Sequence, residues 1–104
     1  MIEIIFKPTC IDEYCTKWVT DIIVRDREST VNIVVDSEGT ICAGGEASIK
    51  VFLEAFNIIT WHITNGYKIG KGCVMDINIK KERYIITEPP HVDEYYTVTP
   101  FLNE

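Results

Sequence analysis

Apolar and polar residues alternate along most of the chain up to residue 43, which is typical of β-strands. The opening IEIIF at 2–6 is short and β-branched, and Pro8 should end this strand because proline cannot donate to a ladder. The segment YCTKWVTDIIVRD at 14–26 follows a period of two and predicts a second strand. Residues 30–43 predict a hairpin whose turn is DSEG at 36–39.

The pattern changes in EASIKVFLEAFNIITWHIT, residues 46–64, where the helical spacing of the apolar side chains predicts one long amphipathic helix. The expected buried face carries Ile49, Phe52, Leu53, Phe56, Ile59 and Ile63. Trp61 and Glu54 fall in the polar stripe that remains. Residues 58–64 also alternate as a strand would, and Asn65–Gly66 is a strong hairpin turn, so a shorter helix followed by a strand is the alternative. We favour the continuous helix because its spacing is unbroken.

The remaining segments predict a second hairpin and an arm. Residues 73–79, CVMDINI, alternate again, KKER turns the chain, and YIITE at 84–88 predicts the partner strand. Residues 91–104 form an acidic, aromatic arm that is either docked or mobile. We therefore expect residues 1–104 to be a single α+β domain, with an antiparallel sheet of about five to six short strands packed on one long central helix.

A core can be predicted from the same pattern. Its expected members on the helix are Phe52, Leu53, Phe56 and Ile59. Those on the strands are Ile4, Ile22, Ile33, Val35, Ile77 and Ile85.

Two glycines, Gly44 and Gly45, stand just before the predicted helix, where free backbone N–H groups could bind a phosphate. The neighbouring residues match neither a P-loop nor a dinucleotide fingerprint. Glu46 would also place a carboxylate at the positive end of the helix. We favour a tight strand-to-helix turn in which Glu46 or Ser48 caps the helix.

Four cysteines could form two disulfides in three connectivities: Cys10, Cys15, Cys42 and Cys73. The first residues lack the basic region and the cleavage site of a signal peptide, so we expect reduced thiols and a cytoplasmic location. No apolar run is long enough to cross a membrane. Neither the cysteine spacing nor His62 and His91 complete a ligand set, so no metal and no other cofactor is expected.

The net charge of −6 argues against direct nucleic-acid binding, which requires a basic footprint. The histidines, cysteines and carboxylates lie in no catalytic signature, so we do not expect an enzyme. The charge favours a small acidic binding protein that occupies and inhibits a basic surface of a protein partner, such as a nuclease or a nucleic-acid-binding protein. In size and charge the chain is similar to toxin-immunity proteins and to phage-encoded inhibitors of bacterial defence.

The expected partner surface is aromatic and acidic, as interface hot spots with a polar rim often are. Its predicted residues are Trp61, Glu54, Asp93, Glu94, Tyr95 and Tyr96. Two alternatives remain open. One is a small-molecule-binding domain or small enzyme with a pocket near the Gly44–Gly45 turn, and the other is a structural homo-oligomer, such as a homodimer, built through an edge strand.

Overall fold

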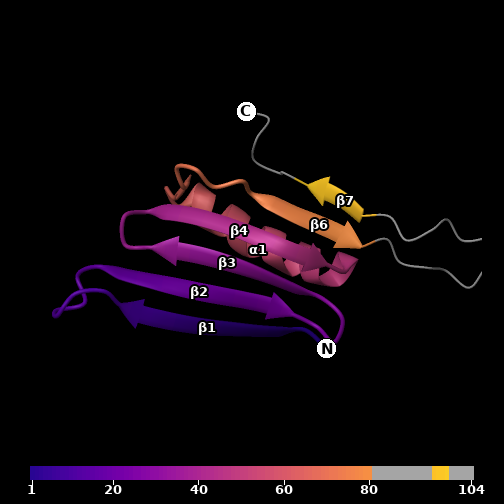
Figure 1. The fold of residues 1–104 in the computed structure, drawn as a ribbon, viewed down its shortest axis with the longest axis horizontal. Coiled ribbons are helices and arrows are strands. Elements are labelled where there is room, and N and C mark those ends of the chain that lie inside the picture. The colour runs from indigo at the N-terminus through magenta and orange to yellow at the C-terminus, as the bar shows by residue number, and fades with distance from the viewer. Residues whose placement is uncertain (81–94, 99–104) are drawn as a thin grey trace, which may run out of the picture.

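The computed structural model describes residues 1–80 and the backbone of residues 95–98, and shows one sheet with a single helix on one of its faces (Figure 1). The elements are β1 (Glu3–Cys10), β2 (Trp18–Arg25), β3 (Thr30–Asp36), β4 (Thr40–Ala47), α1 (Ile49–Thr64), β5 (Lys68–Ile69), β6 (Asp76–Lys80) and β7 (Tyr95–Val98). The α+β prediction is confirmed.

The sheet has the strand order β1-β2-β3-β4-β6-β7 and is mostly antiparallel. Strands β4 and β6 are parallel, which the sequence analysis did not predict. A parallel pair needs a crossover connection, and α1 supplies it. The short strand β5 pairs with the start of β4. The chain therefore forms a four-strand meander and then a β4-α1-β6 unit.

Strand β1 does not end at Pro8 but continues to Cys10, so that prediction is wrong. The backbone N–H of Ile11 donates to the carbonyl oxygen of Lys17 at 2.7 Å, next to the last β1–β2 pair. Every second residue before Ile11 therefore directs its N–H toward β2. Pro8 falls at the alternate positions, where its missing N–H faces the open edge of the sheet, and an edge strand tolerates proline there.

The core lies between α1 and the face of the sheet that it covers. Its buried apolar residues are Ile22, Val24, Val31, Ile33, Val35, Ile41, Ala43, Ala47, Val51, Ala55, Ile59, Met75 and Ile77. The predictions for Ile22, Ile33, Val35, Ile59 and Ile77 are confirmed. Ile4 was also predicted to lie in the core, but it is 39% exposed, so that prediction is wrong. The prediction for Ile85 lies outside the described residues.

Helix α1 is continuous to Thr64, as predicted, but it is rotated relative to the predicted face. Val51, Ala55 and Ile59 face the core. Leu53 is 54% exposed, and Phe52 and Phe56 are half-buried, so their assignment to the core is corrected. Apolar residues occupy more than half of the helix circumference, so the sequence allows several buried faces, and packing on the sheet buries the one with Val51, Ala55 and Ile59.

The start of α1 also differs from the prediction. Gly44 and Gly45 lie inside β4 and not in a turn. Gly45 has a φ of +134°, and a Cβ there would clash with the carbonyl oxygen of Thr30 on β3. The helix begins after Ser48, whose Oγ accepts a hydrogen bond from Val51 N at 3.2 Å. The glycines thus permit close strand pairing, and Ser48 is the cap.

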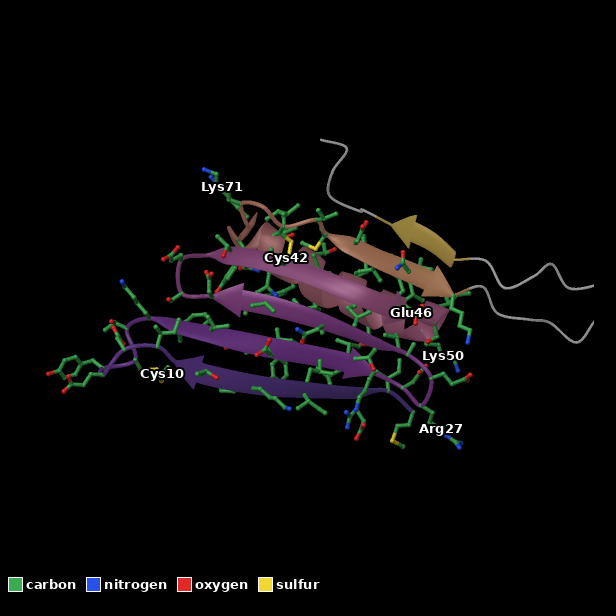
Figure 2. All side chains as sticks on the ribbon, in the orientation of Figure 1. Cys10, Arg27, Cys42, Glu46, Lys50 and Lys71 are labelled. Atoms are coloured by element: carbon green, nitrogen blue, oxygen red, sulfur yellow. A yellow bond between two sulfur atoms is a disulfide. The ribbon has the colours of Figure 1, made fainter. Side chains whose placement is uncertain are left out.

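Two disulfides, Cys10–Cys15 and Cys42–Cys73, overturn the expectation of reduced thiols. Such bonds are typical of oxidising compartments outside the cytoplasm, so the expected cytoplasmic location is wrong. Cys42 on β4 and Cys73 are 31 positions apart, and the crossover brings their Cα atoms to 5.9 Å (Figure 2). Within the described ranges, no helix is long and apolar enough to cross a membrane.

The C-terminal predictions lie largely outside the described residues. The strand expected at 84–88, together with Asp93 and Glu94, belongs to that part of the chain. On its side away from β4, β6 pairs with β7, so part of the predicted 91–104 arm is docked as a strand. Strand β6 begins at Asp76 and not at Cys73.

Candidate functional site

The connection between β1 and β2 is a compact loop, residues 11–17, that protrudes at one end of the sheet (Figure 1). The Cys10–Cys15 disulfide closes it, with the two Cα atoms 4.8 Å apart. The hydrogen bond from Ile11 N to Lys17 O closes its base. Cys15 has a positive φ of 58°, a backbone conformation that few non-glycine residues adopt. The loop is therefore covalently and conformationally constrained.

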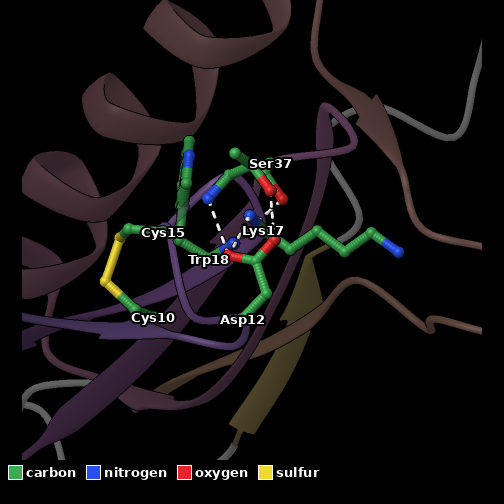
Figure 3. Close-up of a disulfide and its surroundings, with 7 residues drawn as sticks. Cys10, Asp12, Cys15, Lys17, Trp18 and Ser37 are labelled. Carbon is green, nitrogen blue, oxygen red and sulfur yellow. Dashed lines mark hydrogen bonds between the residues drawn. A yellow bond between two sulfur atoms is a disulfide. The ribbon is translucent and has the colours of Figure 1, made fainter.

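Asp12 organises this loop from inside (Figure 3). Its Oδ1 accepts hydrogen bonds from Thr16 N at 2.7 Å and from Lys17 N at 3.2 Å, and its Oδ2 accepts one from the Thr16 hydroxyl. Its own carbonyl oxygen accepts a bond from Cys15 N at 3.2 Å. The Thr16 hydroxyl, followed by the backbone N–H groups, lowers the pKa of Asp12 below its ordinary value. The carboxylate is thus used to hold the loop in shape.

The base of the loop is tied to the neighbouring turn between β3 and β4. Trp18 N donates to Ser37 Oγ at 3.0 Å, and Ser37 N donates to the Trp18 carbonyl at 2.9 Å. Asp36 holds that turn by accepting bonds from Thr40 Oγ1 at 2.6 Å, Glu38 N at 3.0 Å and Thr40 N at 3.1 Å. The Thr40 hydroxyl is the main cause of the lowered pKa of Asp36. The loop therefore stands on a hydrogen-bonded platform.

Two apolar side chains stand on this constrained loop without cover from the described part of the chain. Tyr14 is 81% exposed and Ile11 is 60% exposed, and Glu13 beside them is also exposed. Large apolar side chains in water lose the free energy that burial would give them. A rigid loop that keeps them in water is suited to being buried by another molecule.

The last turn of α1 lies at the same end of the molecule, because α1 runs antiparallel to β4. Trp61 in this turn is 61% exposed, and its ring meets that of His62 edge to face at a centroid distance of 5.0 Å. A hydrogen bond of 2.9 Å from Lys68 N to Gly39 O joins the segment after the helix to the β3–β4 turn. We call loop 11–17, turn 37–39 and Trp61 the loop end.

The structure brings only some of the predicted site residues together. Glu54, which is half-buried, and Trp61 lie two turns apart on one stripe of α1. Tyr96 pairs with Ile79, which also pairs with Ala47 just before the helix. Tyr96 is therefore level with the start of α1, in the strand direction. Trp61 lies in the last turn of the helix, ~18 Å from that start along the helix axis. Tyr95 and Tyr96 belong to β7, and Asp93 and Glu94 lie outside the described residues.

A second polar cluster could suggest chemistry but has a structural explanation. Asp26 accepts hydrogen bonds from Glu28 N, from Ser29 N and Oγ, and from Ser48 Oγ at 2.8 Å. The Glu28 N–H and the Ser48 hydroxyl are the main causes that lower the pKa of Asp26 to about 2. Ser29 Oγ in turn accepts from Ser48 N at 2.9 Å. This cluster joins the β2–β3 turn to the cap of α1.

His62, the histidine within the described residues, is held in place by contacts with neighbouring residues. Its Nδ1 lies 2.8 Å from the carbonyl oxygen of Ile58, and its ring packs edge to face against Tyr67. Among the residues that the structure describes, no three His, Cys, Asp or Glu side chains gather as metal ligands would.

Sequence reasoning missed the loop. A signal was available, because Cys10 and Cys15 bracket IDEY between two predicted strands. Closely spaced cysteines that flank a hairpin connection can staple it, with Ile11 and Tyr14 as its apolar members.

No protein-family model matches this chain, and neither the curated proteins nor the solved structures yielded a match. The functional inference therefore rests on the geometry and the charge of this molecule.

Proposed function

We propose that this chain is a small acidic binding protein that acts outside the cytoplasm and inserts its loop end into a basic, apolar-lined surface of a protein partner. Occupation of that surface would inhibit the partner. The observation that carries the proposal is the disulfide-closed loop with Tyr14 and Ile11 exposed at 81% and 60%.

Constraint of the loop favours binding for an entropic reason. A flexible loop loses conformational entropy when a partner orders it, and each immobilised side chain costs roughly 0.5–1.5 kcal/mol in addition. The disulfide and the Asp12 hydrogen bonds have already restricted the backbone of this loop in the free protein. Tyrosine adds a large contact area with few rotatable bonds, and is therefore frequent at interface hot spots.

The charge of the chain supports the choice of a basic partner. The net charge is −6, and the exposed charged side chains of the loop end are Glu13, Glu38 and Lys17, which leave it net acidic. Such a surface attracts a positively charged one over long distances and raises the association rate at low salt. Nucleases and other nucleic-acid-binding proteins have basic active surfaces, so they remain the partner class that we propose.

Site-specific photo-crosslinking tests the proposal. A photoreactive phenylalanine derivative would replace Tyr14 in one variant and Arg27, an exposed residue at the opposite end of the sheet, in the control (Figure 2). Each variant would be incubated with the proteins of the oxidising compartment of the cells that encode the chain and then irradiated. We expect one stoichiometric basic protein to be crosslinked from the Tyr14 site and not from the Arg27 site.

The captured protein should then satisfy a quantitative criterion. Tyr14→Ala should weaken its binding by about 2 kcal/mol or more, which is roughly a 30-fold rise in Kd. Glu13→Lys should chiefly slow association and flatten its salt dependence. Equal binding by the wild type and by Tyr14→Ala would refute the proposed role of the loop.

A further inference from the structure

The outer edge of β1 offers backbone hydrogen-bonding groups to a further strand. Within the described part of the chain, β1 pairs only with β2 and is therefore an edge strand of the sheet. The Ile11–Lys17 hydrogen bond fixes which residues face which way: Ile5 and Lys7 direct their backbone groups to β2. Ile4 and Phe6 lie at the alternate positions, so their N–H and C=O groups point away from β2.

The same two residues carry exposed apolar side chains. Ile4 and Phe6 stand opposite the buried Val24 and Ile22 of β2. They therefore lie on the same face of the sheet as α1, which covers that face at β3 and β4. They are 39% and 60% exposed because α1 packs mainly over β3 and β4. The apolar layer of the core therefore continues to the edge of the sheet, where an added strand would extend it.

We propose that a second copy of this chain occupies this edge, pairing β1 with β1 in antiparallel fashion about a two-fold axis at Ile5. In this register Ile4 hydrogen-bonds with Phe6 of the partner subunit, and both residues have outward backbone groups. Glu3 then faces Lys7 of the partner subunit, and the symmetry repeats that ion pair. The sequence Glu3–Lys7, EIIFK, is thus its own charge complement when it is reversed.

Neighbouring registers lack this complementarity. Outward backbone groups must face each other, so the register can shift only in steps of two residues. A shift one way sets Glu3 opposite Ile5, and a shift the other way sets it opposite Thr9. Pro8 lacks an N–H, so it weakens any register that depends on the second half of β1. Charge disfavours both shifted registers, and proline disfavours the shift toward the end of β1, so together they select the centred register.

The existing ion pair of Glu3 is compatible with this arrangement. Arg25 Nε lies 2.9 Å from Glu3 Oε1, and the two side chains are 45% and 59% exposed. A carboxylate has about four acceptor sites, so Lys7 of the partner subunit can join the pair. The two-fold axis also sends the two loop ends in opposite directions, so the dimer and the proposed partner contact do not compete.

Charge reversal tests the register directly. The expectation for the wild type is a mass that rises with concentration from 11.9 kDa toward twice that value in sedimentation equilibrium. Lys7→Glu alone should raise the dimer Kd at least about tenfold, because two carboxylates then face each other at both symmetry-related contacts. Glu3→Lys alone should do the same, because two ammonium groups then face each other. An equimolar mixture of the two variants should recover association, because each lysine then faces a glutamate in the mixed dimer. Lys71→Glu, a matched change at an exposed site away from β1, should leave association unchanged.

Amide hydrogen exchange of the wild type keeps the inference testable if a variant folds poorly. The amides of Ile4 and Phe6 should exchange quickly at low concentration and become protected at high concentration. Those of Ile5 and Lys7, bonded to β2, should be protected at both. A mass that stays at 11.9 kDa, or a mixture that associates no better than its components, would overturn the proposal.

Discussion

The two disulfides of this chain lie in very different surroundings. Cys42 and Cys73 are half-buried, 31 positions apart, and their bond encloses the whole of α1 with its core residues. Cys10 and Cys15 are exposed, 5 positions apart, and their bond encloses only the segment from Ile11 to Tyr14. The first bond constrains the folding unit, and the second constrains a surface.

This difference separates stability from function. A bond that closes a long segment removes much conformational entropy from the unfolded chain, so its loss is felt as global instability. A bond that closes a short segment removes less, and its main effect lies in the shape of the loop. If the proposed binding role is right, the smaller contributor to stability should be the larger contributor to partner affinity.

The largest expected effect is that of Cys42→Ser with Cys73→Ser. Loss of this disulfide should lower the free energy of unfolding by about 3–4 kcal/mol, given a closed segment of 31 positions. Urea denaturation of the double variant and the wild type measures this difference. A loss of less than about 1 kcal/mol would mean that the crossover is ordered without its covalent link.

The second expected effect is that of Cys10→Ser with Cys15→Ser. The short segment predicts a loss of about 2 kcal/mol at most. The Asp12 hydrogen bonds remain and should keep part of the loop in place. Exchange of the Thr16 and Lys17 amides, measured beside urea denaturation, reports this local order. If this pair costs more than the Cys42–Cys73 pair, the comparison between the two regions fails.

The third prediction concerns Asp26, which joins the β2–β3 turn to the cap of α1. Its pKa is about 2 in the folded chain against an ordinary 3.8, so its contribution to stability is present above about pH 4 and is lost as the pH falls toward 2. Asp26→Asn should cost about 1 kcal/mol at neutral pH. Thermal melts between pH 2 and 7 should show a shallower acid slope for this variant than for the wild type.

Glu28→Gln is the matched control, because it removes an exposed carboxylate from the same turn. Asp36 and Asp12 also have lowered pKa values and leave part of the acid slope in place. An unchanged slope in Asp26→Asn would show that its hydrogen bonds do not contribute to stability.

The strands and the helix could be predicted because their signals are local. The alternation in β2 and β3, the DSEG turn and the capping hydroxyl of Ser48 all act over a few residues. The rotation of α1 could not, because apolar residues surround much of its circumference. Only the packing of α1 against the sheet shows that Ala55 is buried and Leu53 is exposed.

The remaining errors came from contacts between distant segments. Gly45 looked like a turn residue, whereas its role is to let β4 approach Thr30 on β3. Cys42 and Cys73 meet only because the crossover is parallel. The loop at Cys10–Cys15 is the exception. Its signal, two closely spaced cysteines, was local, but the cysteines were predicted to be reduced. A predicted disulfide there would have indicated Tyr14 and Ile11 as partner-surface residues in place of Tyr95 and Tyr96 of β7.

The smallest expected effect on stability belongs to the exposed aromatic residues of the loop end. Tyr14→Ala and Trp61→Ala remove side chains that are 81% and 61% exposed, so each should change the free energy of unfolding by no more than about 0.5 kcal/mol. Ile59→Ala, on the opposite side of the same helix and fully buried, is the contrasting variant and should cost about 2–5 kcal/mol.

The binding measurement then completes the comparison. Tyr14 stands on the constrained loop and Trp61 on the rigid helix, so both positions are ordered before a partner arrives. Each alanine variant should therefore lose partner affinity while keeping the wild-type melting temperature. If Trp61→Ala unfolds the free protein, its side chain has a structural role and leaves the proposed surface. If Tyr14→Ala alone loses affinity, the contact is confined to the loop and does not extend across the loop end to α1.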